Sequence, residues 1–169
     1  MSEIPTGKDL EEYFYNASYY RGKLINDFCN LELAIERYLV RYFLDKTTER
    51  RELKNLILDR LTFEAKRTAL KTMLDSYEEK RGFIKTKSNK YPQSDLLNEI
   101  RLLNDQRNYF AHYYLAIPVK EEKLVICLAE YRDFVKTHKY TEEKFNAIIE
   151  RIQSATKQLY DLINERFPT

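Results

Sequence analysis

The feature that most constrains the fold is a helical repeat of apolar residues near the start of the chain. Between residues 9 and 45, large apolar side chains recur at intervals of three and four: Leu24, Phe28, Leu31, Ile35, Tyr38 and Tyr42. An α-helix has about 3.6 residues per turn, so this spacing places all six on one face. We therefore expect a long amphipathic helix over residues 9–45, in which Gly22 marks either a bend or a break.

The same periodicity predicts three more helices, over residues 47–77, 92–116 and 141–167. Thr47 or Thr48 is a favourable N-cap for the second helix. Proline at position 118 requires the third helix to end before it, because the residue preceding proline leaves the helical region. The chain is thus expected to be predominantly helical.

Two short apolar runs interrupt this pattern between the third and fourth predicted helices. Residues 124–128 form a continuous apolar run, and residues 134–136 form a second candidate strand. We interpret them as a small β-hairpin. The expected fold is all-α, a four-helix up-and-down bundle with this hairpin between its last two helices, forming one domain over residues 1–169.

Composition agrees with a helical protein and argues against several classes of function. The 169 residues include only 3 glycines and 4 prolines, and the net charge of +2 is too small for a strongly basic nucleic-acid binder, although a local patch is still possible. Cys29 and Cys127 are too few for a disulfide framework or a zinc site, and no phosphate-binding loop or metal-ligand spacing stands out, so we expect no cofactor. Without a long apolar run or a leader sequence, we expect a cytoplasmic protein with no membrane segment.

A polar group interrupts the apolar face of the third predicted helix. Helical spacing places Arg107 within an apolar row, and Asn108 and His112 lie one turn apart on the neighbouring side. The row consists of Leu96, Ile100, Leu103, Phe110 and Tyr114. A guanidinium in such a row needs a paired charge. Glu32, which interrupts the apolar face of the first helix, is the expected partner, whereas Glu36 is expected to be solvated at the edge of that face.

Other basic residues are weaker candidates for contacts to phosphate. Lys66, near the middle of the second predicted helix, either contacts phosphate or extends its ammonium to the surface, which is the commoner arrangement. Lys85 and Lys87 lie in a basic connection over residues 78–93, which is either a solvated loop or a phosphate-binding segment. His138 lies in the strand-like region and is expected at the surface.

The segment Arg107-Asn108-x-x-x-His112, late in the third long helix of a short helical bundle, resembles the signature of the HEPN superfamily. Members of that superfamily are α-helical bundles with an R-x4–6-H motif and a polar residue directly after the arginine. An acidic residue in the first helix also matches, with Glu32 in that place, whereas residues 118–140 depart from the more direct connection of minimal members. The resemblance implies a metal-independent endoribonuclease, often the toxin of a toxin–antitoxin or other defence system, that acts on RNA as a homodimer with a composite cleft.

The chemistry of these residues suits that activity. Cleavage of RNA by attack of the 2′-OH on the adjacent phosphate needs a proton-transfer group and a charge clamp. His112 would transfer the proton, and Arg107 would bind the scissile phosphate. Asn108 would orient either the phosphate or the histidine. Tyr114 extends the motif to R-x4-H-x-Y, which resembles HEPN toxins whose nucleotidyltransferase antitoxin adds nucleotides to the tyrosine; the alternative is a core tyrosine that follows Phe110.

Three classes of function therefore stay open on the sequence alone. The first is the ribonuclease, which requires Arg107 and His112 to reach solvent near one another. The second is a non-catalytic HEPN module that binds RNA or a nucleotide through the same residues. The third is a structural or dimerisation bundle in which Glu32 fully satisfies Arg107. We expect the ribonuclease.

Overall fold

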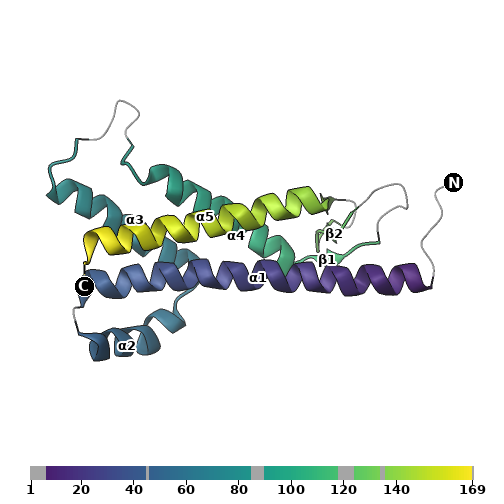
Figure 1. The fold of residues 1–169 in the computed structure, drawn as a ribbon, viewed down its shortest axis with the longest axis horizontal. Helices are drawn as coiled ribbons and strands as arrows, with labels where there is room; N and C mark the ends of the chain where they lie inside the picture. The colour runs from purple at the N-terminus through teal and green to yellow at the C-terminus, as the bar shows by residue number, and fades with distance from the viewer. Residues whose placement is uncertain (1–6, 45, 85–89, 118–123, 134–135, 169) are drawn as a thin grey trace. The chain divides into compact units, whose positions relative to one another are not determined.

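The structure, a computed structural model, describes residues 7–44, 46–84, 90–117, 124–133 and 136–168. It is mostly helical and contains a small antiparallel sheet (Figure 1). In chain order the elements are α1 (Lys8–Phe43), α2 (Thr47–Leu56), the 3-10 helix η1 (Leu58–Arg60), α3 (Phe63–Lys80), α4 (Ser94–His112), β1 (Tyr114–Leu115), β2 (Ile126–Ala129), β3 (Thr137–Tyr140) and α5 (Glu142–Arg166). Within the described ranges, none of the helices combines the length and apolar composition needed to cross a membrane.

The first and last long helices agree with the sequence prediction. α1 continues as a helix through Gly22, where the sequence allowed a bend or a break, and a Cβ added at Gly22 would meet no described neighbour within 4 Å. α5 begins directly after Thr141, whose hydroxyl oxygen accepts a bond from the Lys144 backbone N–H at 3.3 Å. That bond satisfies one of the donors that every helix leaves unpaired at its N-terminus.

The second predicted helix is wrong as a single element, because the chain leaves the helical conformation between α2 and α3. Ile57 caps α2 with φ of −121°, outside the helical range, η1 follows, and Thr62 has an extended backbone with ψ of 155°. The Thr62 hydroxyl oxygen accepts a bond from the Ala65 backbone N–H at 3.2 Å, so α3 has its own N-cap. α2, by contrast, is capped by Lys46 without a side-chain bond, not by Thr47 or Thr48.

The expected two-stranded hairpin is a three-stranded sheet in the order β1-β2-β3. Tyr114 pairs with Ala129, and Ala129 pairs in turn with Thr137, so β2 is the central strand and all its residues are buried. β1 was predicted as part of the third helix. α4 ends at His112 because the next residues take β2 as their backbone partner. Of the second predicted strand, residues 134 and 135 lie outside the described ranges, and β3 begins just after it.

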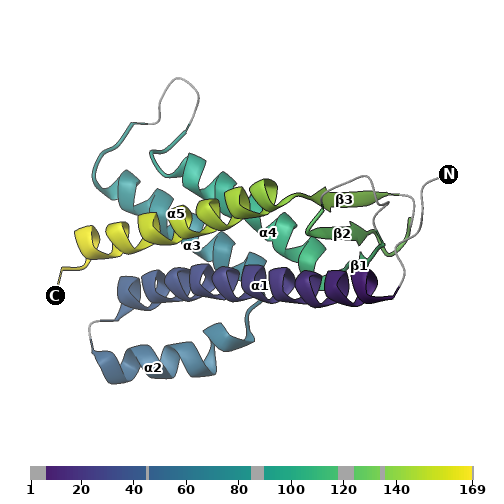
Figure 2. The same ribbon diagram turned by 45° about the vertical axis from the view of Figure 1, so that its right-hand side comes forward.

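The chain divides into two compact units, and each is described by itself. The first contains residues 1–28 and 103–152, and the second contains residues 29–102 and 153–169. In the first unit, the sheet lies beside the N-terminal part of α1 (Figure 2). Buried apolar residues of this unit come from both helices and sheet, and include Leu24, Phe28, Leu103, Phe110, Ile126, Leu128, Tyr140, Phe145 and Ile149. The Phe110 ring lies 4.8 Å from that of Tyr140.

The second unit is helical. α2 runs beside the C-terminal part of α1 in both views (Figures 1 and 2). The fully buried large side chains of this unit include Leu31, Ile35, Tyr38, Leu39, Leu70, Leu74, Ile100 and Leu159. Three charged residues, Glu36, Lys66 and Glu78, are also buried here.

Candidate functional site

The residues of the R-x4-H motif all lie on the last two turns of α4, in the first unit. His112 is the last residue of the helix, and the Tyr113 backbone N–H closes the final turn on the carbonyl oxygen of Tyr109 at 3.0 Å. The Arg21 guanidinium donates to the Tyr113 carbonyl oxygen at 2.6 Å and so holds this end of α4 to α1. The motif is therefore carried by a helix end that has tertiary support.

The Arg107 side chain is half-buried and forms a hydrogen bond with the next residue in the chain, Asn108. Its Nη1 donates to the Asn108 Oδ1 at 3.2 Å, and its guanidinium carbon lies 6.0 Å from the centre of the Phe28 ring. Both contacts suit a cation at the edge of an apolar face, because an aromatic ring attracts a cation and the amide oxygen accepts one N–H. A guanidinium has five N–H donors, so these contacts leave capacity for a ligand.

His112 is exposed, and it lies one turn beyond Asn108 on the same side of α4. Arg107 precedes His112 by five residues, which in an α-helix turns the two side chains about 140° apart around the axis. The structure therefore brings Arg107 to Asn108, and places His112 in solvent at the helix end. One helix alone does not aim the arginine and the histidine at a common point.

Tyr114 does not follow Phe110 on a helical face, because it is the first residue of β1. Its side chain is 49% exposed, and its ring stacks on Tyr131 at 5.6 Å. The alternative of a core tyrosine is therefore wrong, since the chain has turned from helix to strand before this residue.

His138 is a neighbour of the motif helix that sequence reasoning missed. It lies in the middle of β3, half-buried, with its ring 4.1 Å from that of Tyr109 and 5.4 Å from that of Tyr113. Its Nε2 is buried and has no hydrogen-bond partner among the described residues. Burial lowers the pKa of His138, the nearby Lys136 lowers it further, and Glu130 partly opposes them. The prediction of a surface histidine was wrong because the His138 ring packs against Tyr109 and Tyr113, a nonlocal contact that no sequence pattern shows.

Tyr13 joins α1 to the segment after the motif. Its hydroxyl donates to the Ala116 carbonyl oxygen and accepts from the Cys127 backbone N–H, each at 2.9 Å. Burial raises the pKa of Tyr13 to about 12, although the bond from Cys127 acts in the opposite direction. Together with Arg21, this tyrosine fixes both β1 and β2 to the helix that faces them.

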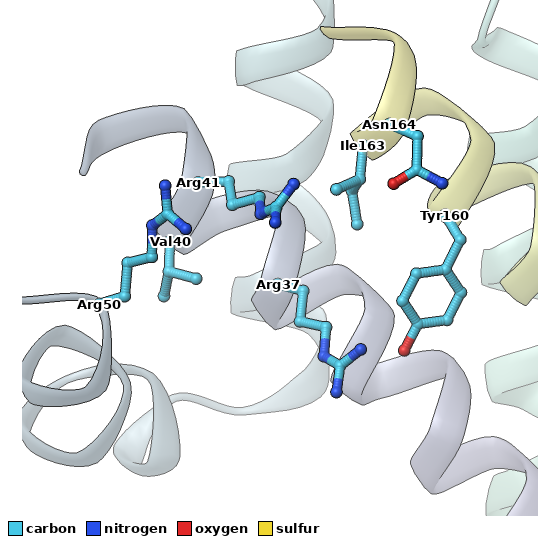
Figure 3. Close-up of a pocket in the computed structure, with 7 residues that line it drawn as sticks. All are labelled: Arg37, Val40, Arg41, Arg50, Tyr160, Ile163 and Asn164. Carbon is cyan, nitrogen blue, oxygen red and sulfur yellow. The ribbon is translucent and has the colours of Figure 1, made fainter. Parts of the chain in front are cut away.

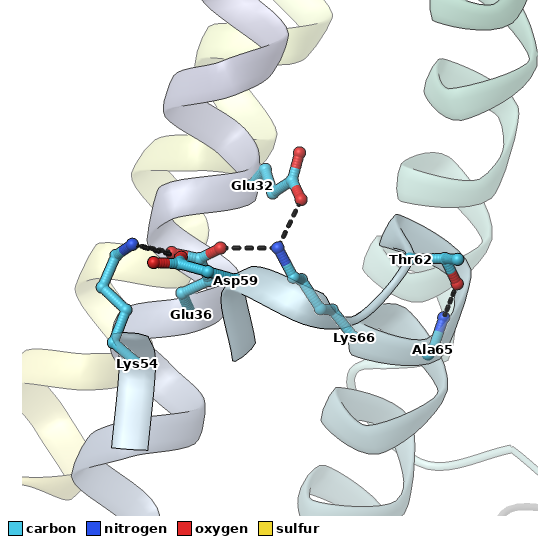
Figure 4. Close-up of polar contacts among 7 residues, drawn as sticks. All are labelled: Glu32, Glu36, Lys54, Asp59, Thr62, Ala65 and Lys66. Atoms are coloured by element: carbon cyan, nitrogen blue, oxygen red, sulfur yellow. Dashed lines mark hydrogen bonds and ion pairs between the residues drawn. The ribbon is translucent and has the colours of Figure 1, made fainter. Parts of the chain in front are cut away.

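Glu32, the expected partner of Arg107, is satisfied by a different cation. The Lys66 ammonium donates to the Glu32 Oε1 and to the Glu36 Oε1, each at 2.6 Å (Figure 4). Lys54 lies 3.4 Å from the other oxygen of Glu36 and also binds Asp59. The expectation of a solvated Glu36 is wrong, since α3 and α2 each bring a lysine to it. Glu32 belongs to the second unit and Arg107 to the first, so Glu32 has no demonstrated role at the motif.

This network also decides the role of Lys66. The residue is only 4% exposed, and both of its bonds go to carboxylates of α1. Burial disfavours its charged form, but the two glutamates outweigh that effect and leave the pKa of Lys66 raised. A buried ammonium between two carboxylates is not available to phosphate, so that interpretation of Lys66 was wrong. Lys85 and Lys87 lie outside the described residues.

Among the residues that the structure describes, no group of three or more histidine, cysteine, aspartate or glutamate side chains is arranged to hold a metal ion. Comparison of the chain with protein-family models, with curated proteins and with solved structures found no match in any of the three.

Proposed function

We propose that this protein is a metal-independent endoribonuclease of the HEPN type, whose active site is shared between two copies of the chain. The observation that carries the proposal is the R-x4-H segment on the last turns of α4, with His112 exposed and Arg107 held against Asn108. These are the residues whose counterparts in that superfamily are functional. We further propose that the protein folds as a four-helix up-and-down bundle in a single domain, with the sheet inserted between α4 and α5.

The proposed reaction needs no group beyond those of the motif and the RNA itself. The 2′ oxygen attacks the adjacent phosphorus while its proton passes to a histidine. The bond from phosphorus to the 5′ oxygen breaks, and that oxygen receives a proton from a second histidine. The products are a 2′,3′-cyclic phosphate and a 5′-OH. Two His112 side chains in a dimer supply the base and the acid, because imidazole exchanges protons near neutral pH.

Arg107 would stabilise the charge that develops on the phosphate. A guanidinium binds two phosphate oxygens in parallel, and fixed donors at a developing charge lower the barrier more than they strengthen substrate binding. Asn108 would orient Arg107 through the bond at 3.2 Å. Because the arginine and histidine of one helix point about 140° apart, a second copy of α4 is the simplest source of the missing partner.

The partners that follow are RNA, a second copy of this chain and, for a toxin of this type, an antitoxin in the cytoplasm. Tyr114, which is half exposed, extends the motif to R-x4-H-x-Y and is the proposed residue for nucleotide addition by a nucleotidyltransferase-type antitoxin. The exposure of the side chain supports this proposal, because an enzyme that modifies a tyrosine must reach its hydroxyl.

The test is incubation of the purified 169-residue chain with end-labelled RNA in excess EDTA. We expect cleavage by the wild type and none by His112→Ala, whose exposed position makes unfolding an unlikely cause and whose circular dichroism should match the wild type. Arg107→Lys should lose most activity because lysine lacks the bidentate fork, and Asn108→Ala should lose less. RNA binding without cleavage would instead identify a non-catalytic HEPN binding module.

A further inference from the structure

A pocket in the second unit is surrounded by three arginines. It has a volume of about 240 Å³ and lies between Arg37 and Arg41 of α1, Arg50 of α2, and Tyr160 and Asn164 of α5 (Figure 3). The figure shows Arg37 and Arg41 between Arg50 on one side and the α5 residues on the other, with the Arg37 guanidinium toward Tyr160. None of these residues belongs to the R-x4-H motif.

Neutral contacts position each of the three guanidinium groups. The Arg41 Nη1 donates to the Phe167 carbonyl oxygen at 3.0 Å, and the Arg50 Nε donates to the Leu44 carbonyl oxygen at 2.7 Å. The Arg37 guanidinium lies 5.4 Å from the centre of the Tyr160 ring. Each contact occupies only part of a five-donor group, so most donors remain for a ligand.

No carboxylate balances these charges in the part of the chain that the structure describes. Among the described residues that line the pocket there is no aspartate or glutamate, and none of the three arginines forms an ion pair with another described residue. Other arginines do have such partners, as Arg67 has Glu64. Three like charges around one pocket repel one another, and an anion at its centre removes that repulsion.

We propose that this pocket binds a small anion that carries a diphosphate group. A single phosphate group carries a charge of about −1.5 to −2 at neutral pH, so the larger charge of a diphosphate better balances three guanidinium groups. The pocket is smaller than the roughly 300–1,000 Å³ of sites for drug-sized ligands, and so suits a compact anion. Guanidinium forks match the paired oxygens of phosphate groups, and the Asn164 amide adds a neutral donor. Ile163, which is 3% exposed, gives the pocket an apolar floor.

The proposal does not depend on ribonuclease activity, and isothermal titration calorimetry of the full-length chain tests it directly. Inorganic pyrophosphate is the probe, titrated at constant ionic strength, with orthophosphate and ADP as further ligands. We expect one pyrophosphate per chain and weaker binding of orthophosphate. Binding of ADP as strong as that of pyrophosphate would assign the site to nucleoside diphosphates, and failure of ADP would assign it to inorganic diphosphate; both outcomes support a diphosphate site.

The variants are Arg37→Gln and Arg50→Gln, with Arg51→Gln as the matched control. Arg51 is an exposed arginine of the same helix as Arg50 and does not line the pocket. Loss of one charge-assisted contact should weaken pyrophosphate binding about tenfold or more in each pocket variant, whereas the control should bind within about twofold of the wild type. Arg37 is exposed, so its replacement should not unfold the chain, and circular dichroism checks this for all three variants.

Three results would overturn the proposal. The first is the absence of pyrophosphate binding by the wild type at millimolar concentration, and the second is equal binding by the pocket variants and the control. The third comes from a single-stranded RNA oligonucleotide titrated in parallel. If the RNA binds through Arg37 and Arg50 and pyrophosphate does not displace it, the pocket contacts a polynucleotide and not a free diphosphate.

Discussion

At the scale of single residues, the buried arginine of the second unit, Arg166, is paired with a buried carboxylate, although its Nε has no hydrogen-bond partner among the described residues. The Arg166 guanidinium donates to the Glu78 carboxylate at 2.6 Å and to the Tyr38 hydroxyl at 2.8 Å, and it lies 4.0 Å from the centre of the Tyr77 ring. The side chains of Arg166 and Glu78 are 2% and 8% exposed. Removing one member of such a pair leaves a buried charge without compensation, and this cost exceeds the net stabilisation by the intact pair.

Glu78→Ala is therefore expected to lower the free energy of unfolding by about 3–5 kcal/mol. Urea denaturation followed by circular dichroism measures it. Glu52→Ala, at an exposed glutamate of α2, is the control and should change stability by no more than about 0.5 kcal/mol. A loss below about 1 kcal/mol for Glu78→Ala would mean that the pair behaves as a solvated surface bridge.

A second prediction concerns His138. Burial and the nearby Lys136 lower its pKa, and Glu130 partly opposes them. The folded chain keeps this imidazole neutral, while the unfolded chain takes up a proton below about pH 6.5. The unfolded state then binds more protons, so stability should fall as the pH drops below about 6.5, until the folded-state pKa is reached. His138→Phe keeps a ring against Tyr109 and should remove this part of the slope. Identical pH profiles of the variant and the wild type would contradict the assignment.

At the scale of elements, the sequence prediction succeeded for helices that are defined by local features, namely apolar periodicity and N-capping residues. α1 and α5 are long, with a periodic apolar face, and the Thr141 cap fixes the start of α5, so both were predictable. The break between α2 and α3 was missed because apolar residues continue at helical spacing across it, and only the Thr62 cap marks it. β1 was missed because a two-residue strand is defined by its pairing with β2, which is a nonlocal interaction.

The Thr62 cap can be tested separately from the rest of the break. Thr62→Ala removes the bond to the Ala65 N–H and should cost about 1 kcal/mol of stability, with faster amide exchange in the first turn of α3. Thr62→Asn supplies another side-chain oxygen at the same position and should retain most of the stability. If alanine and asparagine behave alike, the side chain does not cap the helix.

At the scale of the whole molecule, the candidate site was predictable in part. Helical spacing correctly placed Arg107, Asn108 and His112 at the end of one helix. It did not predict which cation pairs with Glu32. Glu32 and Lys66 are 34 residues apart in the chain, and no sequence pattern links them. His138 was missed for a similar reason, because its contact with Tyr109 depends on the register of the sheet.

The proposed composite site requires a dimer, and the first unit has exposed aromatic residues suited to an interface. Tyr114, which follows the motif helix, and Tyr131, on which its ring stacks, are 49% and 63% exposed. Large exposed apolar side chains that gather at one place often mark a contact surface. Light scattering at micromolar concentration should therefore give twice the chain mass of 20.4 kDa. A mass of one chain would remove the composite site from the account.

The measurement that tests the central claim most directly compares an RNA oligonucleotide with its DNA counterpart of the same sequence, in EDTA, with the ends of the products identified. We expect the wild type to cut only the RNA, giving 5′-OH and 2′,3′-cyclic phosphate ends, and His112→Ala to cut neither. The 2′-OH is the nucleophile in this mechanism, so DNA offers nothing to attack the phosphate. Cleavage of DNA as fast as RNA, or normal cleavage by His112→Ala, would contradict the account.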